Sequence, residues 1–254
     1  MVKHYSNFNI QKKHKGSIVL IGNFDGLHQG HQKLFKLAQS YKKKYNLKIG
    51  VINFDPMPKM FFNKKLKNFR LSNVDQKIKL LSKFKVDFVI TKKFDKKFSK
   101  TKALNFIIEI LNKKLNSKFI FVSNNFRFGN NREGNVNLLI ENEKTYNYKV
   151  IKPKPLTKDK KIVSSSLIRN LLENGFLEKA NKLLDRNWTI EGIVQKGRQV
   201  GKKIGFPTCN IDIHDYVLAK PGVYAVKVLR KNNTKYLRGI ANLGFRPTFN
   251  QKKI

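Results

Sequence analysis

Up to about residue 186, short apolar runs alternate along the chain with segments in which apolar residues recur at helical spacing. Four runs predict buried strands: SIVLIG (17–22), LKIGVINF (47–54), VDFVIT (86–91) and KFIFVS (118–123). Strands that alternate with helices are typical of a mostly parallel sheet covered on both faces. In such sheets, ligands bind beyond the carboxyl ends of the strands.

Helices are predicted between these strands. The segment SNVDQKIKLLSKF (72–84) opens with Ser72 and has Asp75 three residues on, which predicts a weak capping box. Two other segments place apolar residues on one helical face, at Leu34, Leu37, Ala38 and Tyr41, and at Leu104, Ile107, Ile108, Leu111 and Leu115.

The pattern changes after Arg186. Residues 188–197, 222–229 and 236–244 read as β-like runs broken by Gly, Pro and Asn, and no strong amphipathic helix follows residue 188. We therefore predict two domains, an α/β domain over 1–186 and a small all-β barrel or sandwich over 187–254.

Composition adds a strong positive charge. The 254 residues include 54 Lys and Arg against 16 Asp and Glu, a net charge of +38. Such charge attracts polyanions. However, Lys, Asn, Ile and Phe are abundant throughout and form no basic tail, which is typical of an AT-rich genome. We favour that compositional explanation, although a basic surface would still recruit a phosphorylated small molecule.

Other features of the chain favour a reducing cytoplasm. Cys209 stands alone, which excludes an internal disulfide framework. No apolar run is long enough to cross a membrane, and the N-terminus has no apolar core of a signal peptide. We expect a cytoplasmic protein without a membrane partner; the sequence does not predict an oligomer.

The first predicted strand leads into GNFDGLHQGH (22–31). Its glycines allow tight backbone turns close to a ligand. The start of the next helix offers unpaired N–H groups to a phosphate. One helical turn would place His28 and His31 on the same side, where their ring donors could stabilise charge on a reacting phosphate. The alternatives are a zinc site, which lacks a third ligand at a familiar spacing, and a purely structural turn.

This stretch resembles the HxGH motif of the nucleotidyltransferase superfamily. With GNFDG before it, it is similar to the bacterial bifunctional riboflavin kinase/FMN adenylyltransferases, the FAD synthetases. Further segments resemble that family in the same order: NFDPMP (53–58), NNFRFGNNREGN (124–135) and residues 162–186. The resemblance implies a Rossmann-like nucleotidyltransferase domain with a parallel sheet, followed by an all-β riboflavin kinase barrel that is incomplete here. It also implies adenylyl transfer from ATP to FMN.

The resemblance carries site residues with it. It implies catalytic roles for His28, His31 and Arg169, whose guanidinium would grip phosphate. It implies that the flavin is received by a loop containing Asn125, Phe126 and Phe128. It implies ATP binding by Gly22, Asn23, Phe24, Gly26, Ser165, Ser166 and Arg169.

Each assignment has a structural alternative. The serines before Arg169 are also what an ordinary helix cap with a surface arginine would show. Phe126 and Phe128 would equally pin their loop to the core. The role of Asp55 in NFDPMP is not assigned.

The segment GIVQKGRQVGKKIGFPTCNI (192–211) resembles the riboflavin kinase motif that ends in PTAN, with Cys209 in place of Ala. With that resemblance, nucleotide binding is expected of Gly197, Gly201, Lys203 and Gly205. Thr208 and Asn210 offer uncharged oxygens suited to Mg²⁺ that is already bound to phosphates. By itself, this glycine-rich segment reads as a β-hairpin with turns.

The sequence ends at NQKKI, before the strand that carries the family's catalytic glutamate. A ribityl hydroxyl is a weak nucleophile that benefits from a positioned base. We therefore expect this chain to phosphorylate riboflavin poorly. The expected substrates and products are ATP, FMN, riboflavin and FAD, with Mg²⁺.

Two other functions stay open. Another HxGH transferase would act on pantetheine phosphate, nicotinate mononucleotide or a cytidylyl donor, but would have no reason to carry the GFPTCN region. A basic nucleic-acid-binding protein is supported by charge alone, because no aromatic RNA-binding motif or zinc-finger spacing occurs. We therefore expect no specific nucleic acid partner.

Overall fold

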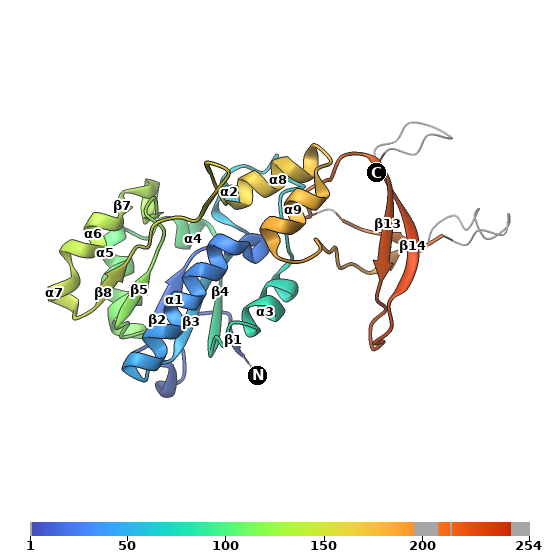
Figure 1. Ribbon diagram of the computed structural model, residues 1–254. Coiled ribbons are helices and arrows are strands. Elements are labelled where there is room, and N and C mark those ends of the chain that lie inside the picture. The colour runs from blue at the N-terminus through green and yellow to red at the C-terminus, as the bar shows by residue number, and fades with distance from the viewer. Residues whose placement is uncertain (1, 196–207, 214, 245–254) are drawn as a thin grey trace.

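A computed structural model describes residues 2–195, 208–213 and 215–244. Its centre is a six-stranded sheet in which every neighbouring pair is parallel. From one edge to the other, the strands are β1 (Lys3–Tyr5), β4 (Phe88–Lys93), β3 (Ile49–Asp55), β2 (Ile18–Ile21), β5 (Phe119–Phe121) and β8 (Lys149–Ile151) (Figure 1).

The strand order creates a crevice for a ligand. From β2 the chain builds outward through β3 and β4, then returns to the other side of β2 with β5 and β8. The direction of winding therefore reverses between β2 and β5. Open α/β sheets bind ligands at such a switch point, outside the carboxyl ends of the strands. The segments that leave β2 and β5 are GNFDG and the predicted flavin loop.

Two apolar layers cover the sheet. Strand β2 shows the alternation, because Ile18 and Leu20 pack on one face and Val19 and Ile21 on the other, all almost fully buried. Helices α1 (Gln29–Tyr45) and α3 (Val74–Ser82) contribute to the first layer. The second layer contains α5 (Ala103–Asn105), the π-helical η3 (Phe106–Lys114) and α6 (Val136–Glu141).

Short elements complete this domain. They are η1 (Lys12–His14), η2 (Asp25–Leu27), α2 (Pro58–Phe62), α4 (Lys96–Ser99), the β6–β7 pair (Arg127–Phe128 and Gly134–Asn135), η4 (Asn130–Arg132), α7 (Glu143–Tyr146), the β9–β10 pair (Thr157–Lys158 and Lys161–Ile162), α8 (Ser165–Glu173) and α9 (Leu177–Leu184). Among the described helices, none combines the length and apolar character needed to cross a membrane.

The predicted strands and helices of this domain are present, with three corrections. Leu104, which the apolar spacing places on a buried helical face, is 49% exposed. The capping box of α3 is formed by Asn73 and Gln76, whose side chains each bond the other's backbone, and not by Ser72 and Asp75. The outer strands β1 and β8 were not predicted, because each has three residues and too short a pattern to stand out.

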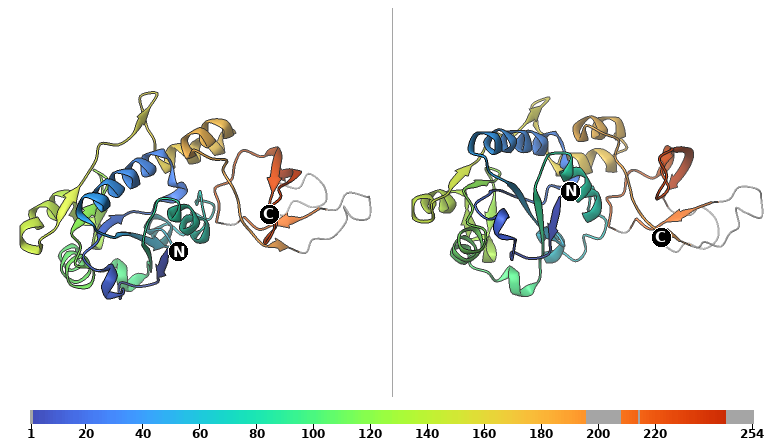
Figure 2. Two further views of the ribbon diagram at one scale, coloured as in Figure 1. Left: turned by 60° about the horizontal axis from the view of Figure 1, so that its bottom comes forward. Right: turned by 90° about the horizontal axis from the view of Figure 1, so that it is seen from below.

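The C-terminal region is β-rich, as predicted. Its described strands form the antiparallel pairs β11 (Val194–Gln195) with β12 (Asn210–Ile211), and β13 (Gly222–Val228) with β14 (Leu237–Leu243). Figures 1 and 2 show the β13–β14 ribbon beside the end of the molecule that carries α8 and α9.

Residues on both sides of the predicted boundary pack together. Trp188 donates from Nε1 to the carbonyl of Leu71 at 3.0 Å, and the amide of Val217 donates to the carbonyl of Arg70 at 2.8 Å. Val217 and Ala219 are buried with residues of α8 and α9. The segment 69–72 is thus held by both regions of the chain.

Candidate functional site

The GNFDG turn changes the direction of the chain after β2. Phe24 adopts a left-handed conformation, and Gly26 has a φ of +75°. A Cβ on Gly26 would lie 2.8 Å from the Leu71 side chain, so the turn needs glycine for both its conformation and its close packing. The turn delivers His28 to the N-cap position of α1, with His31 in the first helical turn.

The structure brings the two histidines together. Their rings stack with centroids 3.7 Å apart and planes inclined by 22°. A Cβ on Gly30 would lie 3.1 Å from the His28 ring, so this glycine allows the ring to lie against the helix start. The Phe24 ring meets His31 edge-on, with centroids 5.2 Å apart, and supports the pair from the core side. The pairing predicted from the spacing is therefore present.

Burial keeps both rings neutral. Desolvation lowers the pKa of His28 to about 4. Burial also lowers the pKa of His31 well below its usual value, with a further contribution from the neighbouring His28. At neutral pH each ring therefore carries one N–H and one lone pair. The Nδ1 atoms of both rings are buried and have no hydrogen-bond partner among the described residues.

Asp25 organises the turn beneath the histidines, although the sequence analysis did not select it. Its side chain is 2% exposed. The carboxylate accepts hydrogen bonds from the amides of Leu71 and Ser72 and, at 2.5 Å, from Nη2 of Arg169. A lone carboxylate inside a glycine-rich turn directly after a buried strand was the available signal.

Arg169 bonds other parts of the chain. Besides its ion pair with Asp25, its Nε donates to the carbonyl of Phe69 at 2.6 Å, and the guanidinium lies 3.7 Å from the centre of the Phe69 ring. The side chain is buried, and two of its five N–H donors, one on Nε and one on Nη2, are used inside the protein. Arg169 therefore joins α8 to the segment 69–72, and its predicted contact with phosphate stays a prediction.

The serines before Arg169 have separate positions. Ser164, which was not predicted as a site residue, is the N-cap of α8 and accepts from the amide of Leu167. Ser165 donates from Oγ to the carbonyl of Asp25 at 2.8 Å. Ser166 is exposed in the first turn of α8. Of the two predicted phosphate-binding hydroxyls, Ser165 is thus tied to the turn, and Ser166 faces solvent.

The remaining predicted ATP-binding residues lie in the turn itself. Gly22 and Asn23 are half-buried, at the carboxyl end of β2. The Phe24 ring is buried and packs on Phe35 and His31, so its side chain belongs to the core. Gly26 is buried, and its carbonyl accepts from Nη2 of Arg186 at 2.8 Å.

The predicted flavin loop follows β5 on the other side of the switch point. Asn125 is exposed, and its Oδ1 accepts from Oγ of Ser123 at 2.9 Å. Phe126 and Phe128 stack on each other with centroids 5.4 Å apart. Phe128 is buried in the core beside Phe106, as the alternative interpretation expected, whereas Phe126 is half-buried.

The predicted site in the C-terminal region is described only in part. Gly197, Gly201, Lys203 and Gly205 lie outside the described residues. Thr208 and Asn210 are exposed, and Asn210 belongs to β12. The described residues contain no cluster of three or more His, Cys, Asp or Glu side chains that could hold a metal ion.

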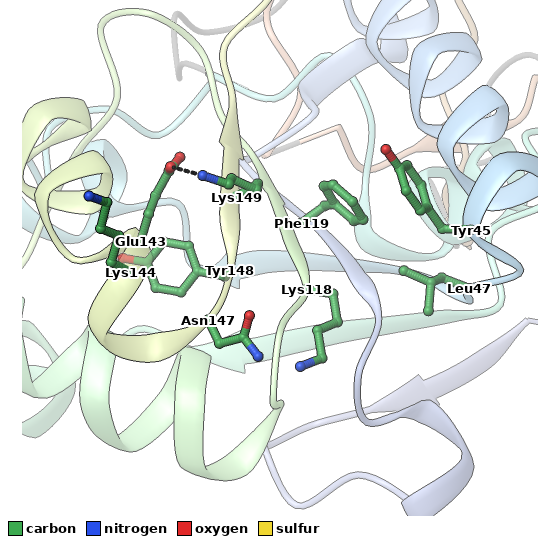
Figure 3. Close-up of a pocket in the computed structure, with 9 residues that line it drawn as sticks. All are labelled: Tyr45, Leu47, Lys118, Phe119, Glu143, Lys144, Asn147, Tyr148 and Lys149. Carbon is green, nitrogen blue, oxygen red and sulfur yellow. Dashed lines mark hydrogen bonds and ion pairs between the residues drawn. The ribbon is translucent and has the colours of Figure 1, made fainter.

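A pocket of about 510 Å³ opens at the opposite edge of the sheet, where the strands begin (Figure 3). Lys118 and Phe119 lead into β5, and Tyr148 and Lys149 lead into β8. Lys149 forms an ion pair with Glu143 at 3.0 Å. The pocket is basic and aromatic, but it lies away from the histidines and from the switch point.

Family models and known proteins match both regions of the chain. The family model for FAD synthetase matches residues 10–167, and the model for riboflavin kinase matches residues 184–254. A bifunctional riboflavin kinase/FMN adenylyltransferase of Buchnera aphidicola (subspecies Schizaphis graminum) is 42% identical over 246 residues, which are 96% of this chain and 78% of the relative. The protein of the same description from Escherichia coli K12 is 37% identical, over 94% of this chain and 76% of the relative.

A solved structure shares the architecture. The crystal structure of a protein from Streptococcus pneumoniae described as a macrolide-efflux protein aligns with a TM-score of 0.79 and 27% identity, covering 98% of this chain and 80% of that one. The matches extend over both regions of the chain.

Proposed function

Because the chain belongs to the family of bifunctional riboflavin kinase/FMN adenylyltransferases, we propose that its α/β domain makes FAD from FMN and ATP. A phosphate oxygen of FMN attacks the α-phosphorus of ATP. The bond from that phosphorus to the bridging oxygen breaks, and pyrophosphate leaves with the electron pair. The observation that carries the proposal is the stacked pair of His28 and His31 at the switch point of a parallel sheet.

The histidines act by donating hydrogen bonds. An FMN phosphate is already ionised, so the attacking group needs no general base. What remains is to hold the reactants in line and to stabilise the charge that builds up on the transferring phosphoryl group. Neutral imidazoles held rigidly by Phe24 and Gly30 supply directed N–H donors with little reorganisation during the reaction.

Asp25 and Arg169 position this machinery. Their ion pair joins the GNFDG turn to α8, while Ser165 bonds the carbonyl of Asp25. This leaves Ser166, which is exposed in the first turn of α8, to face a phosphate. Asn23 and Gly22 lie at the end of β2, where a nucleotide would pass.

Mg²⁺ fits as a partner of the ATP phosphates. A magnesium ion of this kind keeps several waters and takes few protein ligands. Thr208 and Asn210 present exposed, uncharged oxygens suited to such an ion in the C-terminal region. When bound, the ion offsets phosphate charge.

The C-terminal region would phosphorylate riboflavin with ATP, an assignment that rests on the family match to residues 184–254. The expectation of a poor kinase gains no support from that match, and we do not propose it. A different HxGH transferase is disfavoured by the same match, because the second region then has no role.

The test is to incubate the chain with ATP, Mg²⁺ and either FMN or riboflavin, and to separate the flavins by chromatography. We expect FAD and pyrophosphate from FMN, and FMN followed by FAD from riboflavin. A chain that binds RNA in a salt-dependent way but produces no FAD from FMN would contradict the proposal and favour a nucleic-acid-binding protein.

A further inference from the structure

Lys77 is a buried lysine that the mechanism above does not use. It lies in α3 and is 1% exposed. Leu81, four residues on, packs in the same apolar layer as Val51 of β3, so Lys77 faces the sheet as well. Helix α3 starts after the carboxyl end of β3 and leads back to the start of β4. Lys77 is one turn nearer its start than Leu81 and therefore lies toward the edge that carries the histidines.

Asn53 lies on the same face of the sheet. It follows Val51 by two residues in β3, so both side chains point to the layer that contains α1 and α3. Asn53 is 1% exposed, and neither Oδ1 nor Nδ2 has a hydrogen-bond partner among the described residues. Buried polar groups are almost always bonded, so two unpaired atoms on one side chain indicate a missing partner.

The two carboxylates nearest Lys77 are already paired with other cations. Asp25 and Asp55 are both near enough to act on it, but Asp25 is paired with Arg169 at 2.5 Å and Asp55 with Arg70 at 2.6 Å. The structure shows no ion pair or hydrogen bond for the Lys77 ammonium among the described residues. Burial, the neighbouring His28 and the Lys77 charge all lower the pKa of His31, which agrees with the position of Lys77 in the first turn of α3. A buried cation without its own anion is unfavourable, so burial lowers the pKa of Lys77, and a bound anion would favour its charged form.

We propose that Lys77 and Asn53 form a phosphate-binding floor beneath His28 and His31, which receives a phosphate group of the substrates. This inference rests on the proposed adenylyl transfer and adds two residues to its site. Lys77 supplies the charge, and the Asn53 amide supplies a directed N–H donor. The phosphate comes either from the triphosphate of ATP or from the phosphomonoester of FMN.

The test compares the full chain with its Lys77→Met and Asn53→Leu variants, using Lys83→Met as the matched control. Lys83 is exposed at the end of the same helix. The measurements are the dissociation constant of pyrophosphate by calorimetry with Mg²⁺, the kcat and KM of FAD formation, and the thermal midpoint. We expect Lys77→Met to weaken pyrophosphate binding or to raise the KM for FMN, by roughly tenfold to a hundredfold, which is the range for a hydrogen bond to a charged group.

Two arms of measurement distinguish the two possible phosphates: the affinity for pyrophosphate with the KM for ATP, and the KM for FMN. A loss confined to pyrophosphate and to the KM for ATP assigns the floor to the triphosphate, and a loss confined to the KM for FMN assigns it to the flavin phosphate. Asn53→Leu should weaken phosphate binding in the same arm as Lys77→Met, by a smaller factor. Lys83→Met should match the wild type.

Thermal stability separates this proposal from a structural role. Methionine removes a buried charge, so Lys77→Met should melt at or above the wild-type temperature while binding phosphate less well. A variant that melts lower and keeps both phosphate affinities, or that does not fold, would overturn the proposal. If the wild type makes FAD and Lys77→Met is unchanged in both arms, only this inference falls. If the wild type makes no FAD, the proposed function falls.

Discussion

Lysines lie at both ends of the parallel strands, but they differ in burial and in pairing. Below, the amino edge is the side where the strands begin and the carboxyl edge is the side where they end. At the amino edge, Lys149 is 66% exposed and pairs with Glu143 in an open pocket. At the carboxyl edge, Lys77 is 1% exposed, and the buried Asp25 and Arg169 pair with each other beside it. Solvent and salt screen an exposed pair such as Lys149 and Glu143, so it contributes little to stability. In a chain with a net charge of +38, exposed lysines are common and do not mark a site by themselves. Burial and unpaired polar atoms are rarer and are therefore the more specific signal.

Replacing the buried carboxylate of Asp25 should change the free energy of unfolding more than any other substitution at either edge. Asp25→Asn keeps the shape of the side chain but leaves Arg169 as an uncompensated buried charge. We expect it to lower the free energy of unfolding by about 3 to 5 kcal/mol, measured by urea denaturation. Asp95→Asn is the matched control, because Asp95 caps α4 and is only half-buried, and asparagine caps helices equally well. Equal losses from the two variants would mean that the network around Asp25 is not special.

Removing an imidazole should mainly affect the chemistry. His31→Ala is expected to reduce turnover in FAD formation by about a hundredfold to a thousandfold, as loss of a directed donor to a transition state does. The fold should persist, which near-ultraviolet circular dichroism would check. His4→Ala removes an exposed imidazole on β1 and serves as the control. Unchanged turnover in His31→Ala would remove this residue from the mechanism.

Acid should weaken the carboxyl edge through the histidines. The pKa of His28 is about 4 in the folded protein against 6.5 for an unperturbed histidine. The unfolded chain therefore binds the proton first, and the stability from burying the neutral ring is complete above pH 6.5 and is lost as pH falls toward 4. The loss amounts to roughly 3 kcal/mol.

The measurement is urea unfolding of the wild type and of His28→Asn at several pH values in that window. Asn does not titrate there, so the stability of the wild type relative to the variant should fall as the pH is lowered. A difference that stays constant with pH would show that His28 is not held neutral by burial.

The amino edge should show the smallest effect. Lys149→Met removes an exposed ion pair, and we expect the free energy of unfolding to change by less than about 0.5 kcal/mol. FAD formation should be unaffected. A clear loss of FAD formation would show that the pocket in Figure 3 takes part in the reaction and would weaken the distinction between the two edges.

Much of the α/β domain could be predicted because its signals are local. Buried strands contain continuous apolar runs, such as residues 18–21 and 88–90, and the helices between them show apolar faces. The GNFDGLHQGH stretch places both histidines within one turn of a helix start, so its geometry follows from short-range spacing. The β-rich character of the second region follows from its turn residues in the same way.

The family resemblance predicted a function and candidate site residues, which the local signals could not do. It did not determine what each side chain contacts. Arg169 has the residue type of a phosphate ligand, yet it bonds Asp25 and the carbonyl of Phe69. Phe128 has the type of a stacking residue, yet it is buried in the core. A residue's type limits which partners it can have, and the packing around it selects one of them.

The sequence by itself determined the order of the elements, the position of the histidine pair and the family. Only the tertiary structure decided which distant residues lie at the same end of the sheet. Asp25 and Arg169 are 144 residues apart, and Lys77 and Asn53 come from different elements that the strand order brings to one edge. The physical reason is that local spacing fixes backbone conformation, whereas the burial and pairing of a charge depend on long-range packing, which no short stretch encodes.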